Sequence, residues 1–207
     1  MTKEQINVGF LVSYDWYLLK NSLLRVYQDA DIIFLALDKK RITWSGNPFA
    51  FDEQSFKKMI AEMDVNQKIH LYEDDFYLPE LTPIQCDNRE RTLLAKQMGE
   101  GGWHIQIDSD EYLLDFNGFT KYLLKLNPDP QPKQKPINVC CNFINLIKKT
   151  ERGFIMDNFL ENQSNAPIAT NVPIYEAARR NGHSNHISPF LLFMIVGREV
   201  MRSYGEK

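Results

Sequence analysis

Few features of this 207-residue sequence favour a secreted protein, a protein stabilised by structural zinc, or a protein that spans a membrane. It holds only three cysteines, an odd number of which two are adjacent, so we expect no disulfide framework, and no Cys/His spacing suits structural zinc. It also lacks a basic leader followed by an apolar run, and any apolar stretch long enough to cross a bilayer. We therefore expect an intracellular, cytoplasmic protein.

An excess of positive charge is missing as well. The formal net charge is −3 at pH 7, so general attraction to nucleic acid is not favoured, and we expect no nucleic-acid partner. Hydrophobic residues make up 43% and charged residues 25% of the chain, which is typical of a soluble globular protein. The length suits one domain with a substantial core.

What the first half does contain is an alternation of strand and helix patterns. Apolar runs typical of buried strands alternate with segments of helical spacing, the runs lying at 6–12, 32–37, 68–72 and 102–107. This order predicts an α/β fold with a mainly parallel central sheet. We expect Asp15 and Asp87 to cap the helices that follow them, and the acidic residues 73–75 to form a solvated loop.

The most informative stretch is the strand pattern that ends in carboxylates at Asp108, Asp110 and Glu111. Carboxylate oxygens are hard ligands that suit Mg²⁺ or Mn²⁺, often shared with substrate phosphates. Because parallel strands present their carboxyl ends at one edge of the sheet, these acids should lie near Ser13 and Asp38. Taken alone, Asp-x-Asp also fits an acidic turn.

The second half is separated from the first by a proline-rich connection at 127–136, so we expect segments 1–126 and 137–207 within a single domain. Its patterns predict a strand at 137–147, a short strand or bulged segment at 154–160, a brief helix at 174–180 and a strand-like run at 190–196.

In this order, several segments resemble family 2-like glycosyltransferases of the GT-A fold, bacterial enzymes that use nucleotide-sugar donors. The resemblance is carried by the strand 8–12, Asp38, the helix 89–95 and the stretch 102–111, and segments 43–47 and 175–182 add to it. It implies a GT-A-like α/β/α sandwich in which 1–126 binds the nucleotide sugar. Residues 137–207 would form the acceptor side, which is shorter than the family's usual continuation.

The resemblance also implies roles for the acids at the sheet edge. Asp110 would coordinate a divalent cation, Mn²⁺ or Mg²⁺, that bridges the donor diphosphate. Asp108 would contact the ribose or the ion, and Asp38 the base or ribose, with Ser13 and Asp15 close by. A cation placed there would stabilise the negative charge of the leaving diphosphate.

Three basic residues are further candidates. Arg91 or Arg89 would assist the diphosphate, because arginine pairs with phosphate through two hydrogen bonds, although we expect at least one of them on a solvated helix face. His183 is a candidate metal ligand, since some relatives use a late histidine; a histidine hydrogen-bonded within a loop is the alternative.

An inverting transferase needs a general base on the acceptor hydroxyl, normally Asp or Glu. The second half offers Asp157, Glu161 and Glu176, of which we favour Asp157, before Asn158 at the end of a predicted strand. The aromatic residues Trp44, Phe49 and Phe51 either stack on a sugar or belong to the core.

The leading hypothesis is a metal-dependent glycosyltransferase of bacterial surface polysaccharide biosynthesis. It would transfer a sugar from a nucleotide-sugar donor to a glycan or lipid-linked acceptor, which allows peripheral membrane association without a transmembrane segment. One alternative is a degenerate nucleotide-sugar-binding module without turnover. A nucleotidyltransferase is the other; against it, no Gly-rich loop bearing Lys or Arg follows the first strand.

Overall fold

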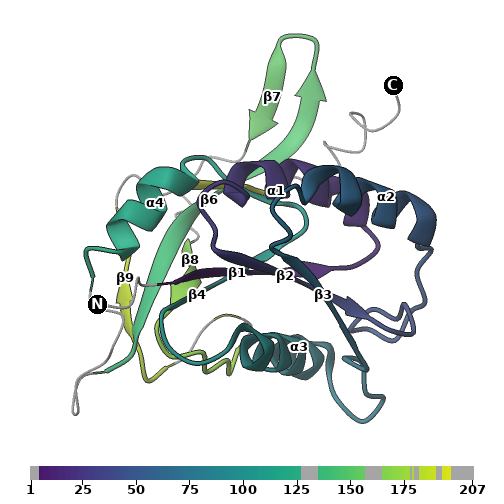
Figure 1. Cartoon of the computed structure of the whole chain (residues 1–207), viewed down its shortest axis with the longest axis horizontal. Helices are drawn as coiled ribbons and strands as arrows, with labels where there is room; N and C mark the ends of the chain where they lie inside the picture. The colour runs from purple at the N-terminus through teal and green to yellow at the C-terminus, as the bar shows by residue number, and fades with distance from the viewer. Residues whose placement is uncertain are drawn as a thin grey trace.

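The first half of the chain builds four parallel strands in the order β3-β2-β1-β4 (Figure 1). The computed structural model describes residues 5–126, 135–156, 165–177, 179, 182–189 and 193–196. The four strands are β1 (Ile6–Val12), β2 (Ile32–Asp38), β3 (Ile69–Asp74) and β4 (Trp103–Asp108). All seven residues of β1 are buried, as expected for a central strand covered on both faces.

Three of the predicted strands match their observed bounds closely, whereas β3 runs further than expected. Glu73 and Asp74 pair in register with Leu37 and Asp38 of β2, so the expectation of a solvated loop is wrong for these two residues. The ladder continues because β2 extends to Asp38 and offers backbone partners up to that point.

Helices cover both faces of the sheet (Figure 1). On one side lie α1 (Leu19–Val26), preceded by the 3₁₀ turn η1 (Trp16–Leu18), α2 (Glu53–Met63) and α4 (Phe116–Leu123). On the other lies α3 (Pro83–Met98). Gly9 in β1 lets α3 approach closely, because a Cβ there would lie 2.8 Å from Cδ2 of Leu94. Each helix in the described part of the chain is too short or too polar to span a bilayer.

Two predicted helix caps are wrong. Asp15 precedes η1, and its side chain makes no capping hydrogen bond. The helix predicted to begin after Asp87 begins earlier, because Thr82 and Gln85 form a capping box and Pro83 occupies the first turn. Asp87 therefore lies inside α3, where it pairs with Arg91 four residues later.

The second half adds further strands to the same sheet, through both antiparallel and parallel pairings. β8 (Asn165–Thr170) pairs antiparallel with β4 and with β6 (Ile137–Thr150). β10 (Phe193–Val196) lies between β6 and β5 (Glu111–Leu113), which gives the sheet path β3-β2-β1-β4-β8-β6-β10-β5. β7 (Gly153–Met156) and β9 (Asn185–Ile187) pair with β6. The fold is mixed α/β with a mostly parallel central sheet, and strands from both predicted halves share that sheet.

The strand predicted at 137–147 is confirmed and extends to Thr150. Of the segment predicted at 154–160, the described part forms β7, and the rest lies outside the described residues. The helix predicted at 174–180 is wrong for its first four residues, which are described and are not helical.

Candidate functional site

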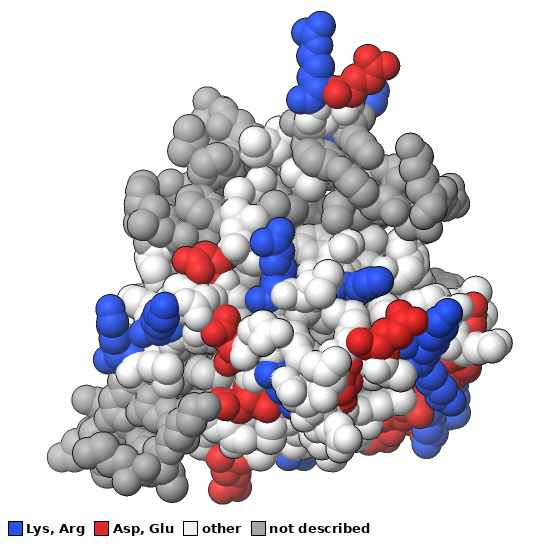
Figure 2. Space-filling model, turned by 45° about the horizontal axis from the view of Figure 1, so that its top comes forward, with Lys and Arg blue, Asp and Glu red and all other residues white. Residues whose placement is uncertain are grey.

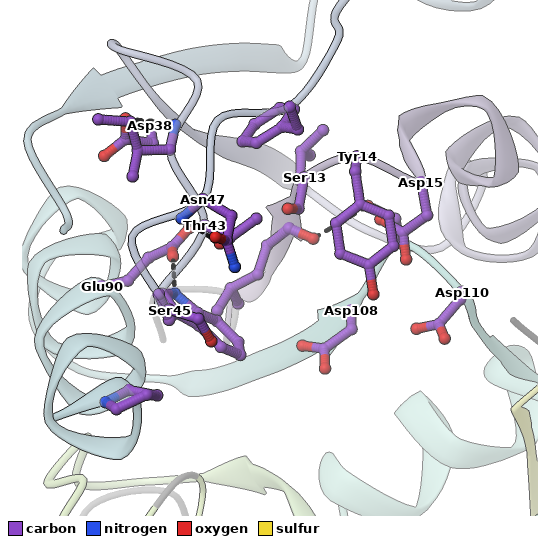
Figure 3. A pocket seen from close by; sticks show the side chains of 17 residues that line it. Ser13, Tyr14, Asp15, Asp38, Thr43, Ser45, Asn47, Glu90, Asp108 and Asp110 are labelled. Atoms are coloured by element: carbon purple, nitrogen blue, oxygen red, sulfur yellow. Dashed lines mark hydrogen bonds between the residues drawn. The ribbon is translucent and has the colours of Figure 1, made fainter.

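A pocket of about 350 Å³ lies where β1, β2 and β4 end (Figure 3). Five of the acids and hydroxyls expected at this edge line it, namely Ser13, Asp15, Asp38, Asp108 and Asp110, whereas Glu111 does not. Parallel strands bring their carboxyl ends together, which is why segments far apart in the sequence meet here. The loop after β2 and helix α3 complete the wall, with Thr43, Trp44, Asn47, Phe49 and Glu90 among their contributions.

Asp38 organises the loops at one end of this pocket. Its Oδ1 accepts hydrogen bonds from the backbone N–H of Lys40 at 2.9 Å and of Ile42 at 3.1 Å. Its Oδ2 accepts from the backbone N–H of Phe76 at 3.0 Å and of Tyr77 at 3.3 Å. One buried carboxylate thus holds the loop after β2 against the loop after β3, and with it the pocket wall that contains Trp44.

The Asp108–Asp110 turn is fixed to the neighbouring strand. The hydroxyl of Ser109 donates to the carbonyl of Leu11 at 2.9 Å, and the backbone N–H of Ser109 donates to the same oxygen at 3.2 Å. Glu111 Oε2 accepts from the backbone N–H of Asp108 at 2.8 Å. Figure 3 shows Asp108 and Asp110 on one side of the pocket, away from Asp38. The acidic turn is therefore held rigidly at the pocket, with Asp110 almost fully buried.

Two buried arginines that do not line this pocket hold Asp108. Arg91 donates through Nε to Asp87 Oδ1 at 2.7 Å and through Nη2 to Asp108 Oδ1 at 2.9 Å. Arg179 Nη2 lies 3.2 Å from the same Asp108 oxygen and 2.5 Å from Glu111 Oε2. These contacts orient the Asp108 carboxylate, which leaves Arg91 beside the pocket rather than among the residues that line it.

Burial governs the charges in this network. It raises the pKa of the Asp87 and Glu111 carboxyls, and the two arginines act in the opposite direction. Burial alone would lower the pKa of Arg179, but Glu111 and Asp108 hold it above its usual range. The arginines also line a neighbouring cavity of about 210 Å³, which shares Trp44 and Asp108 with the first pocket.

Glu90 is a pocket residue that the sequence analysis missed. Its Oε2 accepts a hydrogen bond from Trp44 Nε1 at 2.6 Å, and its side chain is almost completely buried. Burial raises the pKa of Glu90 to about 8. A signal was present in the sequence, because Glu90 lies four residues after Cys86 and four before Leu94, on the helix stripe that faces the core.

The structure separates the three aromatic candidates. Trp44 and Phe49 line the pocket, so they can contact a ligand. Phe51 instead packs against Phe56, with ring centroids 4.9 Å apart, and against Trp16 in the core.

The donor set at the acidic turn suits a cation shared with a ligand. Asp108 and Asp110 supply carboxylate oxygens at the same pocket, and Mg²⁺ is commonly held by one or two carboxylates plus substrate phosphates. Within the described residues, no group of three His, Cys, Asp or Glu could hold a metal by itself. The residues therefore fit a cation that arrives with an anionic ligand better than a cage made by protein alone.

The structure does not place the other predicted site residues of the second half at the Asp108–Asp110 turn. The His183 side chain is 83% exposed, and its Nε2 lies 3.7 Å from Glu176 Oε1. Neither of these residues lines the pocket. Asp157 and Glu161 lie outside the described residues. Arg179, which the sequence analysis did not single out, is the basic residue from the second half that reaches Asp108. No periodicity marks it, because its segment is irregular.

Comparison with known proteins identifies no family. No family model matches the chain, and no curated protein matches it. Among solved structures, the crystal structure of 4-diphosphocytidyl-2C-methyl-D-erythritol synthase is similar with a TM-score of 0.41 and 8% sequence identity. That similarity covers 80% of this chain and 74% of that chain. A likeness this distant assigns neither family nor activity.

Proposed function

We propose that this protein is a divalent-cation-dependent glycosyltransferase of the GT-A type that uses a nucleotide-sugar donor. The observation that carries the proposal is the meeting of Asp108 and Asp110 with Asp38 around one pocket at the carboxyl ends of β1, β2 and β4. Open α/β sheets bind ligands at this edge. The acceptor would be a glycan or a lipid-linked glycan of bacterial surface polysaccharide biosynthesis.

The charge of the pocket supports the need for a cation. The carboxyl groups of Asp15, Asp38, Asp108 and Asp110 line it, whereas none of its described lining residues is Lys or Arg. A diphosphate placed among these acids would be repelled, because like charges at short distance raise the energy of both groups. A divalent cation at Asp108 and Asp110 would reverse that repulsion and would stabilise the diphosphate as it leaves.

The residues divide the pocket into two ends, as Figure 3 illustrates. Asp38, Thr43 and Asn47 lie at the end proposed for the nucleoside. Trp44, which follows Thr43 in the chain and also lines the pocket, offers an aromatic surface. Asp110 and Asp108 lie at the end proposed for the diphosphate, with Ser13 and Asp15 on the loop after β1. Arg91 and Arg179 would fix the orientation of Asp108 and keep its charge in place.

In the proposed reaction, the bond between the anomeric carbon and the diphosphate oxygen breaks, and the nucleoside diphosphate leaves with the electron pair. An acceptor hydroxyl oxygen forms the new bond to that carbon and gives its proton to a carboxylate base. We keep Asp157 as the proposed base, to be tested by substitution. His183 is not kept as a metal ligand, because it does not line the pocket.

The first experiment measures thermal unfolding of the wild type and Asp110→Asn with a panel of nucleoside diphosphates, each with and without Mn²⁺. A ligand that binds only the folded state at 100 times its Kd stabilises it by about 2.7 kcal/mol. For a chain of this length we expect a midpoint rise of roughly 5–10 °C for the preferred nucleotide with Mn²⁺. Asp110→Asn should abolish this rise.

Glu62→Gln is the matched control, because Glu62 is exposed on α2 and does not line the pocket. It should respond to Mn²⁺ and nucleotide like the wild type. An equal rise in Asp110→Asn, or a rise that needs no cation, would contradict the assignment. Release of the nucleoside diphosphate from the matching nucleotide sugar then distinguishes transfer from binding alone. Pyrophosphate release from a nucleoside triphosphate and a sugar phosphate would instead indicate nucleotidyl transfer.

A further inference from the structure

The hairpin formed by the end of β6 and β7 projects from the body of the protein (Figure 1). Residues 137–145 of β6 pair with β8, β9 and β10 in the main sheet. Beyond Asn145, the partner of β6 is β7, through pairs such as Leu146 with Met156 and Lys148 with Ile155. The hairpin is thus a two-stranded ribbon, an arrangement that is marginally stable in water unless something packs against it.

This ribbon carries three exposed apolar side chains. Ile147 is 59% exposed, Met156 is 50% exposed and Ile155 is 49% exposed. Single exposed apolar residues are common on protein surfaces, but a group of them on a projecting element is typical of a contact surface. Function at the pocket does not account for them, because none of the three lines it.

The same ribbon is basic in a protein that is acidic overall. Segment 146–156 contains Lys148, Lys149 and Arg152 against the single acid Glu151, whereas the whole chain carries a net charge of −3. Lys148 lies directly opposite Ile155 in the strand register, so cation and apolar group occupy the same cross-strand pair. Figure 2 shows basic side chains beside an acidic one at the projecting tip.

We infer that the β6–β7 hairpin docks the protein on an anionic membrane surface. Exposed Ile147 and Ile155 would enter the boundary between headgroups and acyl chains, and Lys148 and Arg152 would remain at the lipid phosphates. Anionic lipids attract basic segments near the bilayer, which matches the local charge. A second copy of the chain is a poorer occupant, because two like-charged hairpins would repel each other. The inference does not depend on the proposed activity.

The test is sedimentation of the full chain with vesicles of phosphatidylcholine alone, or with one third phosphatidylglycerol. We expect binding to the anionic vesicles alone, and weaker binding as salt rises. A basic residue near such a surface contributes roughly fivefold to the partition coefficient, so Lys148→Glu/Arg152→Glu should lower it by more than tenfold. Ile147→Ser/Ile155→Ser should lower it to a similar extent by removing the inserted groups.

Two control variants make equal changes elsewhere. Lys57→Glu/Lys58→Glu reverses two charges on α2, at side chains 71% and 76% exposed. Leu24→Ser/Val65→Ser removes apolar groups that are 62% and 74% exposed. Both should bind vesicles like the wild type, and circular dichroism should show all four variants folded. The inference is overturned if the wild type does not bind anionic vesicles, or if the controls lose as much binding as the hairpin variants. It is equally overturned if the hairpin variants change only the oligomeric state in light scattering.

Discussion

Replacing Glu90 by Gln should make the stability of this protein much less sensitive to rising pH. Glu90 is buried beside Trp44, and burial raises its pKa from 4.5 to about 8. Between these values the folded state binds more protons than the unfolded state, so the free energy of unfolding falls as pH rises. The stabilisation is fully present below pH 4.5 and is lost as pH rises through about 8.

The size of the effect follows from the shift. The pKa of Glu90 rises from 4.5 to about 8, and each pH unit corresponds to about 1.4 kcal/mol. Glu90 therefore adds at most about 5 kcal/mol to the free energy of unfolding at low pH. About 3 kcal/mol of this stabilisation is already lost at pH 7. Gln stays neutral and its carbonyl oxygen can still accept the Trp44 Nε1 hydrogen bond. The variant should therefore gain stability relative to the wild type as pH rises, by up to about 1.4 kcal/mol per unit.

The assay is urea unfolding of both proteins at pH 5, 6, 7, 8 and 9, followed by circular dichroism. Other groups titrate in both proteins, so the difference in unfolding free energy isolates Glu90. Glu62→Gln, at an exposed position on α2, is unfolded in parallel as the control substitution. A difference between Glu90→Gln and the wild type that is equally flat would refute the reasoning, because it would mean that Glu90 ionises alike in both states.

At two other positions, the loss of buried partners predicts a lower free energy of unfolding. Arg179→Met should lower the free energy of unfolding by about 3–5 kcal/mol, because Asp108 and Glu111 would lose a buried partner, and calorimetry should show a midpoint lower by roughly 10 °C. Near-wild-type stability would mean that these acids find other partners. Asp38→Asn should cost about 1–3 kcal/mol, since its amide nitrogen cannot accept from the two backbone N–H groups that one oxygen now satisfies. Urea unfolding would measure this loss, and an unchanged midpoint would contradict it.

The sequence predicted the parallel half of the fold well, because its strands are continuous apolar runs that the periodicity of side chains reveals. It also placed Asp38, Asp108 and Asp110 at one edge, since that result needs only the parallel order of the strands. The family and the activity of the chain are proposals, because one fold can carry many different functional sites.

What the sequence did not predict depends on contacts between distant segments. The path through β8, β6, β10 and β5 is set by pairing between residues as far apart as Leu113 and Met194, for which no local pattern exists. The buried positions of Glu90 and Arg179 likewise follow from packing, because charged residues are usually exposed. The failed cap at Asp87 has a local cause, since the stronger capping box at Thr82 begins the helix one turn earlier.

The position of β10 has a consequence for how the protein is made. β10 lies between β5, which directly follows the acidic turn, and β6, and it is the last strand in the described part of the chain. Ribosomes release the N-terminal segments first, so β5 and β6 must wait with open hydrogen-bonding edges until this strand emerges. Such edges pair readily with other chains. The nascent protein is thus most prone to aggregate late in its synthesis, after the parallel half has been completed.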